Sequence, residues 1–201
     1  MGGNEPAETR SARDRILDTA YDLFSRHGVR AVGVDTIISE SGVAKMTLYR
    51  NFTSKDELIL EFLRVREERW TRDWLQAEAE RRATTPDGRL LAIFDVFDEW
   101  FQLDDFEGCS FVNVLLEVTD LESPVRRASV EHLATIRTFV AGLAVEAGIS
   151  DPDGFARQWH ILMKGSIVSA GEGDRLAARR ARELGRLLLA QALPAPAAGS
   201  D

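Results

Sequence analysis

The sequence predicts an all-α protein of about nine helices, and three observations support this fold class. Apolar residues recur at helical spacing through most of the 201 residues. Gly and Pro divide these segments at positions where helices commonly end or begin. Runs of alternating Val, Ile, Thr and Tyr are missing, and so is any Asn-Gly hairpin turn, so strands are not expected.

Three short helices are expected in the first quarter of the chain. The first is indicated by apolar residues at i, i+3/4 and i+7, followed by Gly28 at the position that commonly ends a helix: Ile16, Leu17, Ala20, Leu23 and Phe24. A second helix over 34–41 ends at Gly42, and a third covers 45–52.

A long helix over 55–82 is expected next, because Ser54 and Glu57 have the spacing of a capping box. Proline after Thr85, Ser123 and Asp151 marks three further helix starts, since proline is favoured at the first helical position. The remaining helices are therefore predicted at 86–103, 110–120, 124–147, 152–171 and 174–193, with a Pro/Ala/Gly-rich tail after them.

Composition and cysteine content narrow the class of protein. Hydrophobic residues make up 44% and charged residues 29%, which is typical of a soluble globular protein. Cys109 is the single cysteine, so an internal disulfide is excluded, and a buried apolar role is favoured over a redox role. No apolar run approaches the ~18 residues of a membrane span, and residues 1–15 lack a signal-peptide pattern. We therefore expect a cytoplasmic protein with no membrane partner.

The net charge of −8 argues at first against a nucleic-acid partner. However, residues 1–55 carry eight Lys/Arg and seven Asp/Glu, so the acidic excess lies entirely in the rest of the chain. DNA binding depends on the local basic face rather than on the total charge. The small surplus predicts weak non-specific DNA affinity.

Catalytic and metal-binding patterns are missing from the sequence. His27, His132 and His160 lie far apart, and no metalloprotease, nucleophile-elbow or phosphate-loop motif occurs. We expect no catalytic residue, no metal and no cofactor. His160 follows Trp159 on an apolar helix and is expected to be a core histidine with satisfied hydrogen bonds.

Residues 34–52 have the pattern of a helix-turn-helix. Gly42 suits the tight turn, and five apolar residues are spaced to bury the seam: Ile37, Ile38, Val43, Leu48 and Phe52. The remaining side chains of the second helix point outward: Lys45, Met46, Thr47, Tyr49, Arg50 and Asn51. By itself, this pattern is more typical of an ordinary helical hairpin with a solvated polar face.

A wider match favours DNA binding. Residues 12–60 resemble the N-terminal domain of TetR-family repressors, through Ile16–Ala20, Leu23–Phe24, Gly28, Ile37, Ser41–Val43 and Thr47–Leu58. The resemblance implies a DNA-binding domain at 10–55 and an effector-binding and dimerisation domain at 56–193, with disordered segments at 1–9 and 194–201. It implies a ligand-responsive transcriptional regulator, expected to be a repressor, whose partners are double-stranded DNA, a small hydrophobic or aromatic effector and a second copy of the chain.

In the family, the positions matching Thr47, Tyr49 and Lys55 contact DNA. Lysine and arginine can neutralise phosphate or donate to guanine, and the Thr47 methyl suits a thymine methyl. Asp35 departs from the family pattern and would repel phosphate, so Thr36 is taken as a substitute contact. The predicted DNA-binding residues are Thr36, Lys45, Met46, Thr47, Tyr49, Arg50, Asn51 and Lys55.

Aromatic residues are frequent in the second domain. A stripe at helical spacing is most often core, and the alternative is a cavity for an apolar effector. Asn113 and Glu117 lie in a segment, 108–117, that resembles one branch of the family; they face either an effector or solvent. The predicted pocket residues are Trp70, Trp74, Phe97, Trp100, Phe101, Phe111, Asn113, Glu117, Trp159 and Met163.

The last two helices carry small and branched residues, and the resemblance implies that they form a four-helix bundle with a second copy. The predicted interface residues are Ala156, Gly165, Ser166, Ala170, Ala181, Leu184 and Leu188. The basic run 179–182 is expected to be a solvated face. The second functional hypothesis is a helical ligand-binding or protein-interaction module without DNA binding. The effector, the operator and the choice between repressor and activator stay open.

Overall fold

The computed structural model describes residues 10–194, and this part of the chain contains helices and turns but no strand. The prediction of an all-α protein is therefore confirmed. The segments 1–9 and 195–201, for which disorder was predicted, lie outside the described residues.

Eleven helical segments form nine rods within the described part, because three of the segments run on without a break. That continuous rod consists of α4 (Lys55–Arg66), η1 (Glu67–Gln76) and α5 (Ala77–Arg82). The other helices are α1 (Ala12–His27), α2 (Val34–Ser41), α3 (Lys45–Asn51), α6 (Pro86–Trp100), α7 (Ser110–Glu117), α8 (Pro124–Glu146), α9 (Pro152–Gly171) and α10 (Ala177–Ala192).

The helix starts follow the capping residues expected from the sequence. The Ser54 hydroxyl accepts a hydrogen bond from the Glu57 N–H at 3.1 Å, and the Thr85 hydroxyl accepts one from the Gly88 N–H at 3.2 Å. Each bond satisfies a backbone donor that the first turn leaves free. The Glu57 carboxylate accepts from the Thr53 N–H at 2.6 Å, one residue earlier than a regular capping box would have it.

The long rod departs from its predicted form in the middle. An uninterrupted α-helix was expected over 55–82, but η1 is a π-helix, in which backbone hydrogen bonds span five residues. The segment contains neither Gly nor Pro, so the local sequence carries no signal for the change. Within this segment the ring centroids of Trp70 and Trp74 lie 5.4 Å apart, and both rings lie against Trp100 of α6.

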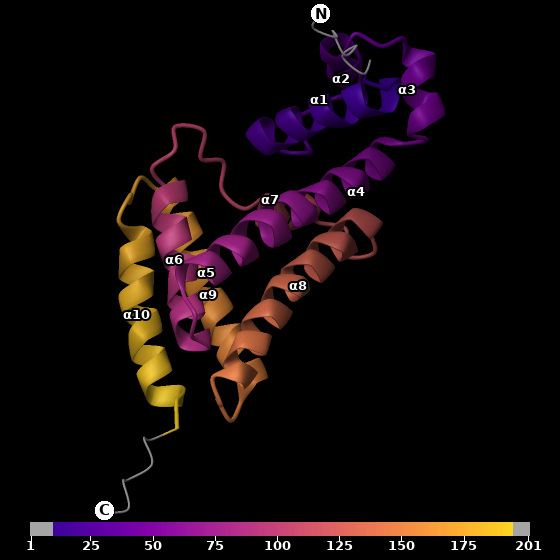
Figure 1. The fold of residues 1–201 in the computed structure, drawn as a ribbon. Helices are drawn as coiled ribbons and strands as arrows, with labels where there is room; N and C mark the ends of the chain where they lie inside the picture. Colours follow the sequence, from indigo (N-terminus) through magenta and orange to yellow (C-terminus); the bar gives the residue numbers. More distant parts are fainter. Residues whose placement is uncertain (1–9, 195–201) are drawn as a thin grey trace, which may run out of the picture.

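Figure 1 shows α1, α2 and α3 grouped at one end of the molecule, with α4 running from α3 into a larger bundle formed by α5 to α10. Phe62 of α4 packs against α1. Its ring centroid lies 5.4 Å from that of Tyr21 and 5.5 Å from that of Phe24. In the bundle, α9 packs between α8 and α10. Gly185 lets α10 approach closely, since a Cβ there would lie 2.8 Å from the Trp159 ring.

Candidate functional site

The helix-turn-helix is built as its sequence pattern predicts. Ile37, Leu48 and Phe52 are buried between α1, α2 and α3. Gly42 ends α2 with φ 64°, a left-handed conformation that a side chain would strain. The Ser41 hydroxyl donates to the Ile37 carbonyl at 2.6 Å and so satisfies a group near the end of α2. These features hold α3 with one face inward and one face free.

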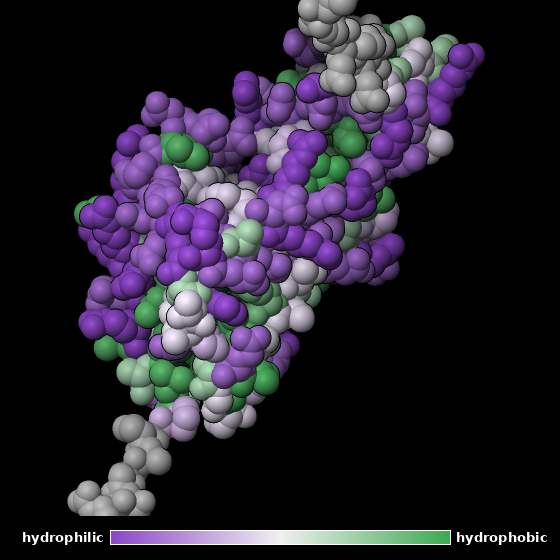
Figure 2. Space-filling view, viewed as in Figure 1, coloured by the Kyte–Doolittle hydropathy of each residue, from purple (hydrophilic) through white to green (hydrophobic). Residues whose placement is uncertain are grey.

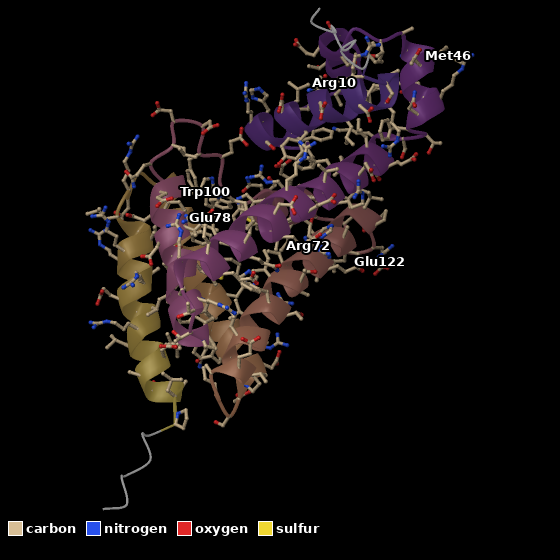
Figure 3. The ribbon with its side chains drawn as sticks, in the orientation of Figure 1. Arg10, Met46, Arg72, Glu78, Trp100 and Glu122 are labelled. Carbon is tan, nitrogen blue, oxygen red and sulfur yellow. The ribbon has the colours of Figure 1, made fainter. Side chains whose placement is uncertain are left out.

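Six of the eight predicted DNA-binding residues lie on α3, whereas Thr36 lies on α2 and Lys55 on α4. Met46 is 65% exposed and Tyr49 41% exposed, although both are large and apolar in part. In Figure 3, Met46 lies at the outer end of the molecule, on the side away from the bundle. Thr47 and Asn51 are half-buried, and the Asn51 amide donates to the Thr47 carbonyl at 2.8 Å. The Asn51 amide is therefore already engaged inside α3. The other predicted residues are exposed, except for the half-buried Lys55: Thr36, Lys45 and Arg50.

Asp35 contacts the leading edge of this face. Its carboxylate lies 3.7 Å from the Lys45 ammonium, and both side chains are largely exposed. The pair reduces the positive charge that Lys45 can present to a phosphate. From the sequence, Asp35 was expected to repel phosphate. Its contact with Lys45 was not predicted, because it depends on how the turn between α2 and α3 brings the two helices together.

Glu117 does not join the aromatic residues with which it was grouped. Its carboxylate accepts a hydrogen bond from the Arg30 N–H at 2.7 Å, which places it against the loop after α1. Burial lowers the pKa of Lys55, while the nearby carboxylates of Asp56 and Glu117 raise it. Neither of the two orientations considered for Glu117, toward an effector or toward solvent, describes this position. Glu117 joins the bundle to the part of the chain formed by α1, α2 and α3.

Three of the predicted pocket residues gather around a cavity of about 290 Å³. The ring centroids of Trp70, Trp74 and Trp100 lie 5.1 to 6.0 Å from one another. Figure 3 marks Trp100 near the top of α6, at the level where the rod of α4 and η1 passes. Phe97 and Phe101 are buried behind Trp100, with ring centroids 5.6 Å from it.

Phe111, Trp159 and Met163 belong to the packed core and not to the wall of the tryptophan cavity. Phe111 stacks on His132 at 5.1 Å, and Trp159 stacks on Phe155 at 5.3 Å. Met163 is buried. For these three residues the core alternative holds, because facing helices fill the space around them.

Asn113 lines a second cavity of about 340 Å³ together with Cys109. Its amide donates to the Glu107 carbonyl at 3.2 Å, which orders the connection before α7. Cys109 is buried, and that burial raises the pKa of its thiol. The expectation that Cys109 is a buried apolar residue agrees with this environment.

His160 lies in the core, as predicted, but the prediction that its hydrogen bonds are satisfied is wrong. The side chain is buried, and its Nδ1 has no hydrogen-bond partner among residues 10–194. Burial, together with the positive charges of Lys164 and Arg137, lowers the pKa of His160 to about 3. The imidazole is therefore neutral at physiological pH.

The predicted interface residues fall on two different faces of α9 and α10. Ala156, Ser166 and Ala181 are buried within the chain, so they offer almost no surface to a second copy. The 3.6-residue period explains the error, because small residues occur on both the inner and the outer face. Gly165 and Leu184 are exposed, and Ala170 and Leu188 are half-buried. The exposed set also contains side chains that sequence reasoning omitted: Ile161, Val168 and Leu187.

The basic run at the start of α10 pairs with α6 instead of forming a purely solvated face. The Arg179 and Arg182 guanidinium groups lie 3.0 and 2.9 Å from the carboxylates of Asp98 and Asp95. Figure 2 shows that hydrophilic residues cover most of the visible face, while hydrophobic residues gather at the lower end of the bundle. Over the described range, no helix is long and apolar enough to cross a membrane, and no His/Cys/Asp/Glu group has the arrangement of a metal site.

Comparison with known proteins decides the family. Residues 16–62 match the family of bacterial regulatory proteins called the tetR family, and residues 86–184 match a tetracyclin repressor-like C-terminal domain. A TetR transcriptional regulator of Streptomyces avermitilis is 31% identical with a TM-score of 0.81, over 91% of this chain and 98% of that one. The chain belongs to the TetR family. It is a DNA-binding transcriptional regulator and not an enzyme.

A second TetR-family regulator, from Streptomyces coelicolor, is 30% identical with a TM-score of 0.82, over 90% of this chain and 95% of that one. Among curated TetR-type proteins, the repressor KstR2 of Mycolicibacterium smegmatis is 30% identical over 97 residues, which cover 47% of this chain and 45% of KstR2. The activator FasR of the same organism is 31% identical over 105 residues, covering 51% of this chain and 45% of FasR. The chain thus spans less than half the length of these curated relatives.

Proposed function

We propose that this TetR-family protein is a cytoplasmic repressor that binds a palindromic operator as a homodimer and is released by a small hydrophobic or aromatic effector. The observation that carries the proposal is the free face of α3. Met46 and Tyr49 are exposed to solvent there, beside the exposed cations Lys45 and Arg50. A helix of this kind fits the major groove, where cations meet phosphate and side chains meet base edges.

The residues of this face have different roles in the proposal. Tyr49 and Lys55 contact phosphates, which fixes the register of the protein on the duplex without reading sequence. Thr47 reads a base through its methyl and hydroxyl groups. Met46, at the leading edge, makes an apolar contact. Asn51 supports Thr47 through its bond to the Thr47 carbonyl and does not contact a base itself.

Dimerisation is supported by the exposed apolar side chains of the last two helices. Ile161 and Leu187 are 64% and 65% exposed, and Val168 and Leu184 are each 53% exposed. Several exposed apolar side chains on two neighbouring helices are typical of an interface. A twofold pair would place two α3 helices about 34–36 Å apart, which matches successive major grooves of a palindrome.

The ligand response is supported by the position of the tryptophan cavity. Its wall includes Tyr21, Ser25 and Arg26 of α1 as well as the three tryptophans of the bundle. A ligand bound there would contact both domains. It could therefore favour one separation of the α3 helices over another by its differential binding energy.

Selection of bound duplexes from random-sequence DNA tests this proposal. We expect enrichment of a palindrome with two half-sites, and binding that weakens steeply with salt as phosphates are neutralised. Tyr49→Ala and Lys55→Ala should weaken all duplexes alike, whereas Thr47→Ser should change the preferred base at one position of each half-site. Glu122→Ala, at an exposed site away from α3, is the control. Salt-insensitive binding, or unchanged binding after loss of both Tyr49 and Lys55, would contradict the proposal.

The contact between Asp35 and Lys45 favours the second hypothesis, a helical module without an operator, because it reduces the charge of the DNA face. The same selection separates the two. Failure to enrich any sequence, from a protein that still dimerises and binds a ligand, would support that alternative.

A further inference from the structure

The cavity beside the three tryptophans has walls of two chemical kinds. One wall consists of the indole rings of Trp70, Trp74 and Trp100, which lie within 6.0 Å of one another. The remaining lining residues are mostly polar and come from α1, from Arg66 of α4 and from the connection between α6 and α7, which also contributes Leu103. In Figure 1 this connection rises above α6 toward the end of α1. Aromatic and charged side chains thus line the same cavity of about 290 Å³.

Three carboxylates and two guanidinium groups line the cavity, so its wall has a net negative charge. The Arg66 guanidinium donates to the Tyr21 hydroxyl at 3.0 Å and lies over the Tyr21 ring. Arg26 lies 3.8 Å from Glu107. Asp22 and Asp105 have no ion-pair partner within 4.0 Å among residues 10–194. Both cations of the wall are therefore engaged, and two of its carboxylates are not.

The pKa of Glu107 agrees with this excess of negative charge. Burial raises the pKa of its carboxyl, and the neighbouring carboxylates of Asp105 and Asp22 raise it further, against the lowering effect of Arg66 and Arg26. An additional positive charge in the cavity would stabilise the ionised form of Glu107.

Two polar atoms of the wall lack partners. The Ser25 hydroxyl and the Trp70 indole N–H are buried, and neither forms a hydrogen bond within the described part of the chain. The whole Ser25 residue is only 8% exposed. A buried polar group without a hydrogen-bond partner destabilises the state that contains it. A bound molecule that supplies an N–H donor would satisfy the Ser25 oxygen.

We propose that this cavity binds a small organic cation, consisting of a flat apolar body that stacks on the indoles and an ammonium or related group that faces Asp22, Asp105 and Ser25. Cations are attracted to indole faces, and desolvation strengthens this attraction. The inference rests on the proposed ligand response, for which it names the chemical class of the effector. Because α1 forms part of the wall, the bound cation contacts the DNA-binding domain directly.

Three probes that share a naphthalene ring system and differ in charge test the proposal: the naphthalen-2-ylmethylammonium cation, neutral naphthalen-2-ylmethanol and the 2-naphthoate anion. They are titrated into the ¹⁵N-labelled full-length protein, whose four tryptophans give four indole N–H signals. Single Trp→Phe variants assign these signals. We expect the cation to bind at least about 10-fold more tightly than the anion, and more tightly than the alcohol. Its binding should shift Trp70, Trp74 and Trp100 and leave Trp159, which packs in the core, unchanged.

Matched variants test the charge assignment. Asp105→Asn should weaken binding of the cation about threefold to tenfold, whereas Asp104→Asn, one residue earlier and outside the cavity wall, should leave it unchanged. Equal affinity for the three probes, tighter binding of naphthoate, or a dominant shift at Trp159 would overturn the proposal.

Operator binding, measured with and without the cation, separates this inference from the proposed function. Binding of the cation with unchanged operator affinity upholds the cation site and overturns the effector role. Intact operator binding by a protein that does not bind the cation overturns the cation site and leaves the proposed regulator standing.

Discussion

The Glu117 carboxylate accepts a hydrogen bond from the Arg30 backbone N–H at 2.7 Å, although 87 positions separate these residues in the chain. Glu117 is the last residue of α7, and Arg30 lies in the loop between α1 and α2. Gly28, beside this contact, has φ 78°, and a Cβ there would overlap the Glu117 carboxylate. A displacement of α7 therefore acts directly on the DNA-binding domain.

Replacing Glu117 with Ala should loosen this junction. We expect the Arg30 amide to exchange with solvent about 10-fold faster, and the free energy of unfolding to fall by about 1 kcal/mol, because the Arg30 N–H loses its acceptor. Residue-resolved hydrogen exchange and chemical denaturation measure the two effects. Glu122→Ala, at a side chain that is 93% exposed, is the control. Unchanged exchange at Arg30 would show that the bond contributes nothing in solution.

Gly28→Ala should destabilise the protein by about 1–2 kcal/mol, because alanine is strained at this φ and its Cβ meets Glu117. Combined with Glu117→Ala, the same change should cost less, since the steric part of the penalty disappears. A double-mutant cycle in chemical denaturation measures this coupling. Strict additivity of the two changes would argue against contact between these residues in solution.

Asp35→Asn should increase operator affinity about threefold, because Lys45 then presents its full charge to a phosphate. The slope of log affinity against log salt concentration should steepen by up to about one unit, which corresponds to one more neutralised phosphate. Glu40→Gln, an exposed change on the same helix, should have a smaller effect. Weaker operator binding by Asp35→Asn would mean that the carboxylate positions Lys45 instead of neutralising it.

Leu184→Glu should convert the proposed dimer to a monomer and lower operator affinity by at least about 100-fold. A charge at the centre of an apolar interface is costly to bury, and a monomer reads a single half-site. Analytical ultracentrifugation and mobility shifts measure the two effects. Leu121→Glu, at a leucine that is 70% exposed outside the helices, is the matched control. A Leu184→Glu protein that still sediments as a dimer would place the interface elsewhere.

His160 should make stability depend on pH. Its pKa in the folded state is lowered from 6.5 to about 3, so the neutral form is favoured by folding. Its contribution is complete above pH 6.5 and is lost as pH falls toward 3, by about 1.4 kcal/mol per pH unit. From pH 7 to pH 5 the wild type should lose about 2 kcal/mol that a His160→Leu variant retains. His27→Gln, at an exposed histidine, controls for the substitution itself. Parallel stability curves for wild type and His160→Leu would contradict this role.

Local physics made most of the fold predictable. Ser54 and Thr85 cap the helices that they precede, and the three X-Pro signals mark the starts of α6, α8 and α9. Gly42 ends α2 in the left-handed conformation that the turn requires. These signals act within a few residues and do not depend on the rest of the chain. The free face of α3 follows for the same reason, because helical spacing alone separates Leu48 from Met46 and Tyr49.

Only the tertiary structure decided which surfaces meet. The same spacing could not tell the inner small residues of α9 from the outer ones, so the buried Ala156 and Ser166 were assigned to an interface and the exposed Ile161 was not. Glu117 was grouped with aromatic residues, but it lies against Arg30. A position on a helix is set by the local backbone, whereas its neighbour across the fold depends on how long-range packing orients each helix.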